Sequence, residues 1–148
     1  MSRAESQSPG ENLPEAGSSA EQVPAPLPSP DVQRALLRRL DELGLLEDPV
    51  FTAEVLGSYL RDGLQTIDDL EAAIVAEDAA ACELLAHRMK GASLNLGAER
   101  LGNTALAIEM LASDGDLPKA LPLIEQLRKE FENVRACLLQ LPGMPKAA

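Results

Sequence analysis

The chain has 148 residues, of which 13 are basic and 24 acidic, so its formal net charge at pH 7 is -11. A charge of this size and sign repels nucleic acid backbones and anionic lipid headgroups, which argues against both as partners. The apolar residues are rich in Ala and Leu, with two Phe, one Tyr and no Trp. This length and composition favour one all-α domain with a tail.

The sequence contains no targeting or membrane signal. No apolar run approaches the roughly 20 residues needed to span a bilayer, and the first ten residues are polar where a signal peptide is apolar. We therefore expect a cytoplasmic protein. In a reducing compartment, cysteines on apolar-rich helical segments are more often small core residues than a disulfide, so we assign no chemical role to Cys82 and Cys137.

Residues 1–30 are rich in Pro, Ser, Gly and Glu and contain almost no large apolar side chains. Such a segment buries too little surface to offset the entropy of ordering, which predicts a disordered tail. A solvated extension is favoured over a tether or docking segment. A short amphipathic helix is expected from Asp31 to a left-handed stop at Gly44. Its inward residues are Val32, Leu36, Leu40 and Leu43.

A long second helix is predicted from Asp48, the N-cap, through Pro49 in the first helical position to near Glu77. Gly57 and Gly63 lie inside it, where each costs about 1 kcal/mol relative to Ala, so we expect close packing or a bend there. The apolar face of this helix consists of Phe51, Val55, Leu60, Leu64, Ile67, Leu70 and Ile74.

Three further helices are expected at residues 78–96, about 98–113 and 117–141, with Gly97 and Gly115 ending the first two. Pro118 suits the first turn of the last helix, whereas Pro122 marks either its true start or a kink. Short connections make neighbouring helices antiparallel. The sequence therefore predicts an all-α, antiparallel up-down four-helix bundle with an additional short N-terminal helix, over residues 31–141, and a flexible C-terminal tail at 142–148.

His87 is the only histidine and lies on the third of these helices. The inward stripe there consists of Cys82, Leu85, Met89, Ser93 and Leu96, and at about 100° per residue His87 faces outward. Lys90 and Gly91, three and four residues later, share its face. A neutral imidazole is a competent nucleophile at cytosolic pH. Lys90 can neutralise phosphate charge, and Gly91 leaves the turn open to a partner.

The segment LAHRMKGASLNLGAERL, residues 85–101, resembles the signature of histidine phosphotransfer (HPt) domains, and the resemblance covers about residues 31–141. The positions that match without a gap are Ala86, His87, Met89, Lys90, Gly91, Ala92, Ser93, Leu96, Gly97 and Leu101. The resemblance implies that His87 Nε2 accepts a phosphoryl group from the receiver domain of a hybrid sensor histidine kinase and passes it to the receiver aspartate of a response regulator. It implies a phosphocarrier with no kinase activity, cofactor or metal of its own, and Mg²⁺ on the receiver.

The same resemblance places at Glu109 the residue that hydrogen-bonds the histidine's Nδ1 or its phosphate. A carboxylate there would fix the tautomer that leaves Nε2 free to attack, although a solvated Glu at the edge of the core remains the rival interpretation. Leu84 and Leu94 flank His87 and fit the inward stripe poorly. We expect them, with Arg88 and Asn95, to contact the partner, while a wider core stripe accounts equally well for the two leucines.

Other classes of site find little support. One His and two scattered Cys give no metal-ligand cluster, and the strand-turn-helix frame of a serine hydrolase is absent from the pattern. Two alternatives remain: a helical adaptor that binds receiver or kinase domains without carrying phosphate, and a detached phosphoacceptor domain of a chemotaxis-type kinase. No glycine-rich nucleotide loop is present, so self-phosphorylation with ATP is not expected. We expect a monomer, because transfer needs a free histidine face.

Overall fold

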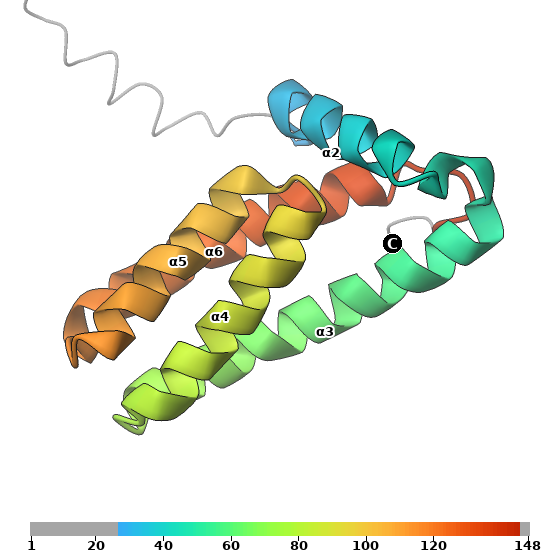
Figure 1. Cartoon of the computed structure of the whole chain (residues 1–148). Helices are drawn as coiled ribbons and strands as arrows, with labels where there is room; N and C mark the ends of the chain where they lie inside the picture. The colour runs from blue at the N-terminus through green and yellow to red at the C-terminus, as the bar shows by residue number, and fades with distance from the viewer. Residues whose placement is uncertain (1–26, 146–148) are drawn as a thin grey trace, which may run out of the picture.

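The computed structural model describes residues 27–145, and this part of the chain consists of helices joined by short turns (Figure 1). The elements are α2 (Pro30–Glu42), the single turn η2 (Leu45–Glu47), α3 (Pro49–Val75), α4 (Ala79–Asn95), α5 (Glu99–Ser113) and α6 (Leu117–Leu138). Short turns make α3, α4, α5 and α6 run alternately up and down, and α2 lies across one end (Figure 1). The predicted all-α four-helix bundle with an additional N-terminal helix is confirmed.

Local sequence signals set the helix boundaries. The Asp48 and Asp78 side chains accept hydrogen bonds from the backbone amides of Phe51 and Ala81, each at 3.1 Å, and so begin α3 and α4. After α4, Gly97 adopts a φ of 81°, a left-handed conformation that costs glycine little and lets the chain reverse into α5. These caps place the four helices close to their expected positions.

Both expected tails need correction where they meet the described residues. Residues 1–26 of the N-terminal tail lie outside the described part of the chain. The boundary at residue 30 is too late, because the Ser29 amide donates to Asn133 Oδ1 of α6 at 2.9 Å and α2 begins at Pro30. At the other end, Met144 is buried with the core. Packing therefore continues past Leu141, into the segment expected to be flexible.

The expected apolar face of α3 is wrong at Phe51, Val55 and Leu64. Phe51 and Leu64 are 51% and 52% exposed, whereas Thr52 and Leu56 are buried. The residues buried there are Thr52, Leu56 and Gly63, each one position away from the expected residue, so a neighbouring face of the helix packs on the core. Leu43, expected to face inward from α2, is also exposed. The fully buried large aliphatic residues are Leu36, Leu40, Leu56, Ile67, Leu70, Leu101, Ile108, Leu127 and Leu138.

The unusual residues inside the helices have separate explanations. Gly63 packs against the Phe131 ring, since a Cβ at this position would lie 2.5 Å from Phe131 Cε1. Close packing is therefore the reason for this glycine, whereas at Gly57 the nearest atom would be 3.4 Å away, on Arg61. Pro122 lies inside α6, which begins at Leu117, so the helix accommodates one missing amide donor near its start.

Candidate functional site

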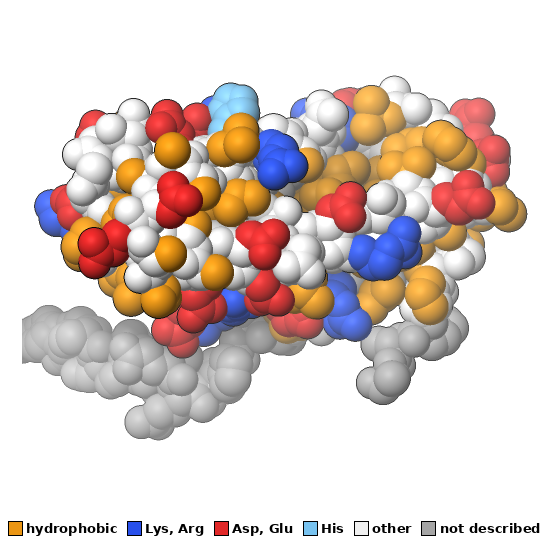
Figure 2. Space-filling view, turned by 90° about the horizontal axis from the view of Figure 1, so that it is seen from below, with side chains coloured by type: hydrophobic (Ala, Val, Ile, Leu, Met, Phe, Trp, Pro, Cys, Tyr) orange, Lys and Arg blue, Asp and Glu red, His pale blue; other side chains and the backbone are white. Residues whose placement is uncertain are grey.

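His87 projects from the middle of α4 into solvent. Its side chain is 61% exposed, while Ala86 and Met89 on the same helix are buried in the core. The outward orientation follows from the register of α4, as helical spacing predicts. In the view of Figure 2, the single histidine side chain stands at the edge of the molecule, beside hydrophobic and cationic side chains.

Glu109 of α5 engages one nitrogen of the His87 ring. Its Oε2 lies 2.9 Å from Nδ1, across the seam where α4 and α5 pack together. A carboxylate accepts hydrogen bonds, so this contact favours the tautomer with the proton on Nδ1 and the lone pair on Nε2. Within residues 27–145, the ring's hydrogen bonding is to Glu109 through Nδ1. Glu109, the residue that the resemblance placed next to the histidine, is thus in contact with it.

Lys90 reaches the site through Glu109. Its Nζ lies 3.0 Å from Glu109 Oε1, and the side chains of Lys90 and Glu109 are only 23% and 17% exposed. Sequence spacing suggested an exposed cation beside the imidazole, but the ammonium instead turns toward α5 and pairs with the carboxylate. Arg88, two residues before Lys90, is exposed.

The charge of Glu109 is stabilised by this arrangement. Partial burial raises the pKa of the carboxyl group, but its contacts with Lys90 and then with His87 favour the ionised form more strongly. The pKa of Glu109 therefore lies below its ordinary value. An ionised carboxylate between an imidazole and an ammonium holds both in fixed positions, so the solvated-Glu interpretation does not apply.

Gly91 leaves a gap in the exposed face of α4. It lies one turn after His87, and a Cβ at this position would meet no atom within 4 Å. Glycine in the interior of a helix is destabilising by roughly 0.5–1 kcal/mol relative to Ala, and no contact in the described residues accounts for it here. The open position is therefore available to a molecule that approaches His87 from outside.

The four residues expected to bind a partner have different environments. Leu84 precedes His87 in the sequence and Arg88 follows it, and both are exposed. The 58% exposure of Leu84 excludes it from the core. Leu94 is only 36% exposed, and its side chain packs on Gly102 of α5. Asn95 is exposed at the C-terminal end of α4. The wider-core interpretation is thus wrong for Leu84 and correct in part for Leu94.

Two features near the histidine were not expected from the sequence. Met110 follows Glu109 in the sequence and is 57% exposed, so α5 carries a large apolar side chain on its surface next to this residue. A groove of about 740 Å³ also runs between α3 and α4, and Arg88 is one of the residues that line it. Other residues that line the groove are Val55, Tyr59, Asp62, Asp69, Leu85 and Met89. Val55 was assigned to the core face of α3, and Tyr59 was assigned to neither face, so the sequence did not predict this groove.

Between residues 27 and 145, no three His, Cys, Asp or Glu side chains come close enough together to bind a metal ion. In the same range, every helix is too short or too polar to cross a membrane. Cys82 and Cys137 are buried as free thiols, and burial raises the pKa of both.

The site is one exposed histidine, oriented by a carboxylate, on the surface of a helical bundle. Such a site is open to partner proteins and is typical of a protein that carries a chemical group between them. The family model of the Hpt domain matches residues 54–137, more than half of the chain, and the chain belongs to this family. Hpt domains act in phosphorelays as phosphocarriers rather than kinases, and they interact with receiver domains. No curated protein matches the chain, and no solved structure matches it.

Proposed function

We propose that this protein accepts a phosphoryl group on His87 from the receiver domain of a hybrid sensor kinase and passes it to the receiver aspartate of a response regulator. The observation that carries the proposal is the contact of His87 Nδ1 with Glu109 Oε2 at 2.9 Å in a ring that is 61% exposed. This contact holds the proton on Nδ1, so that Nε2 faces the partner as the nucleophile.

In the first transfer, the Nε2 lone pair attacks the phosphorus of the receiver's aspartyl phosphate. The N–P bond forms as the P–O bond to the aspartate breaks, and the electron pair leaves with the carboxylate. In the second transfer, a carboxylate oxygen of the next receiver attacks the phosphorus, and the N–P electron pair returns to Nε2. The proton stays on Nδ1 throughout, held by Glu109, and the receiver supplies the Mg²⁺ that its phosphate requires.

The neighbouring residues support these steps in different ways. Lys90 pairs with Glu109 at 3.0 Å, and the other oxygen of this carboxylate contacts His87, so the ammonium brings positive charge close enough to stabilise the phosphoryl group. Gly91 gives the receiver room to approach in line, since no atom lies within 4 Å of where its Cβ would be. The contact surface for the receiver consists of Leu84, Arg88, Leu94 and Asn95. The protein works as a monomer, because transfer needs a free histidine face, and it meets its receiver partners in the cytoplasm.

The test is to incubate the full chain with a receiver domain that carries radiolabelled phosphate. We expect the label on the chain to be stable in alkali and labile in acid, as expected for phosphohistidine. His87→Gln should remove the label without changing the far-UV circular dichroism spectrum, because the side chain is exposed. Arg34→Gln, at an exposed position of α2, is the control and should be labelled like the wild type.

Label that persists in His87→Gln would refute His87 as the acceptor. An unlabelled wild-type chain that still bound the phosphorylated receiver would instead identify a helical adaptor. A third outcome concerns ATP: label transferred from ATP to the chain by an added kinase domain, but never from a receiver, would assign it to the chemotaxis-type phosphoacceptors. Each of the last two results would replace the proposed function.

A further inference from the structure

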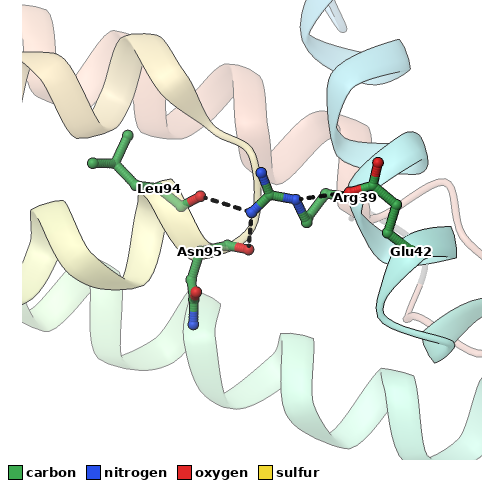
Figure 3. A network of polar contacts seen from close by, with 4 residues as sticks. All are labelled: Arg39, Glu42, Leu94 and Asn95. Atoms are coloured by element: carbon green, nitrogen blue, oxygen red, sulfur yellow. Dashed lines mark hydrogen bonds and ion pairs between the residues drawn. The ribbon is translucent and has the colours of Figure 1, made fainter.

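The C-terminal end of α4 receives its cation from another helix. α4 has no basic residue in its last turn, although unpaired carbonyl groups at a helix C-terminus carry partial negative charge. Arg39 of α2 lies at this end, and its Nη1 donates to the carbonyl oxygens of Leu94 at 3.2 Å and Asn95 at 2.9 Å (Figure 3). Glu42 orients the guanidinium, since its Oε1 accepts from Arg39 Nε at 3.2 Å.

The backbone of α2 lies directly against the turn between α4 and α5. A Cβ at Gly97 would be 3.1 Å from Arg39 Cβ and 3.2 Å from the carbonyl oxygen of Ala35. Leu36 and Leu40, on the inner face of α2, are 1% and 0% exposed and anchor the helix in the core. Arg39 therefore projects from a fixed position, and its side chain joins α2 to the helix that carries His87.

The end held by Arg39 belongs to the same seam as the histidine. Leu94 packs on Gly102 of α5, where a Cβ would lie 2.4 Å from Leu94 Cδ2. Leu94 is seven residues after His87, and Gly102 is seven residues before Glu109. Seven residues are about two helical turns, or roughly 10 Å along the axis. The Leu94–Gly102 contact thus fixes α4 against α5 two turns from the place where His87 meets Glu109.

We propose that Arg39 is a positioning residue: by holding the last carbonyl groups of α4, it fixes the seam that aligns His87 with Glu109. Arg39 lies outside residues 54–137, so the match to the Hpt family does not include it. Its effect on transfer rests on the proposed function, because small displacements of a reacting group slow a reaction strongly. Its effect on the geometry of the seam does not depend on any phosphate.

The test compares Arg39→Met with Arg34→Met in the full chain. Both substitutions remove one positive charge from α2 and keep an unbranched apolar stem. Arg34, however, pairs with Asp31 on its own helix and, within residues 27–145, with no other helix. Two readouts need no phosphate: the ¹⁵N NMR signals of the His87 ring, and amide hydrogen exchange at Leu96, Gly97 and Ala98. The third readout is the rate of phosphoryl transfer from a phosphorylated receiver.

For Arg39→Met, we expect the His87 ring signals to shift and exchange at the turn to become about tenfold faster, from the loss of charge-assisted hydrogen bonds. Transfer should slow by about threefold to tenfold. Arg39→Lys should restore part of each change, because an ammonium still donates to the carbonyl groups but lacks the planar fork. Arg34→Met should match the wild type in all three measurements.

Arg39→Met values equal to those of Arg34→Met would overturn the proposal, and so would a change in exchange with unmoved His87 signals. If Arg39→Met fails to fold by circular dichroism, Glu42→Gln decides: it removes only the carboxylate that orients the guanidinium, and unchanged His87 signals would refute the assignment. A wild-type chain that takes no phosphate would refute the proposed function, while the two phosphate-free readouts would still decide the role of Arg39.

Discussion

Gly91→Ala separates the stability of α4 from its access to a partner. A Cβ at this position meets no atom within 4 Å, so the added methyl group has no steric cost inside the chain. Replacing glycine by alanine in a helix interior is worth about 0.5–1 kcal/mol. We therefore expect the free energy of unfolding to rise by this amount and the thermal midpoint to rise by about 2–5 °C. Urea unfolding followed by far-UV circular dichroism measures the first quantity.

Transfer should change in the opposite direction. The methyl group would stand one turn from His87 on the face that the receiver approaches, and a displacement of about 1 Å at the reacting atoms can cost about 100-fold in rate. We expect transfer from a phosphorylated receiver to Gly91→Ala to slow by about tenfold or more. Gly57→Ala on α3 is the matched control: its nearest atom, on Arg61, is 3.4 Å away, and it should stabilise the fold with no loss of rate. Unaltered transfer by a stabilised Gly91→Ala protein would refute the assigned role.

Two further predictions concern α5. Gly102→Ala would place a Cβ 2.4 Å from Leu94 Cδ2, and overpacking of this kind costs about 1–3 kcal/mol, more than the gain in helix propensity. We therefore expect a lower midpoint of urea unfolding. A higher midpoint would contradict the close packing of Leu94 on Gly102. Glu109→Gln tests the lowered pKa: the ionised carboxylate contributes stability above the unfolded-state pKa, near 4.5, and loses it as the pH falls through the lower folded value. The difference in unfolding free energy between wild type and Glu109→Gln should be full well above pH 4.5 and shrink as the pH falls below that value, whereas a difference independent of pH would contradict this sign.

Features that depend on neighbours in the sequence were predictable. The N-caps at Asp48 and Asp78 bind amides three residues later, so the signal and its partner fall within one helical turn. The outward orientation of His87 follows from the periodicity of one helix. The contact with Glu109 was implied only by resemblance to a family, since the residues lie 22 positions apart on different helices.

Features that depend on how the helices meet were not predictable from periodicity. Phe51 fits the pattern of a core residue, but it is 51% exposed, while its neighbour Thr52 is buried. Lys90 shares the face of His87 by helical arithmetic, yet its long side chain follows a carboxylate on α5. Arg39 was not recognised at all, because the carbonyl groups that it binds are 55 and 56 residues away and leave no mark in the local sequence.

Only Nε2 of the His87 ring is left without a hydrogen bond to Glu109, and this affects how two receivers would compete for the histidine. Nδ1 is occupied by Glu109, so in the proposed relay the donor and the acceptor would use the same atom, Nε2, and each would have to leave before the other binds. In the proposed relay, an excess of unphosphorylated donor therefore competes with the response regulator for the loaded carrier. The ratio of the two receivers in the cell, as well as the activity of the kinase, then sets how much output reaches the end of the pathway.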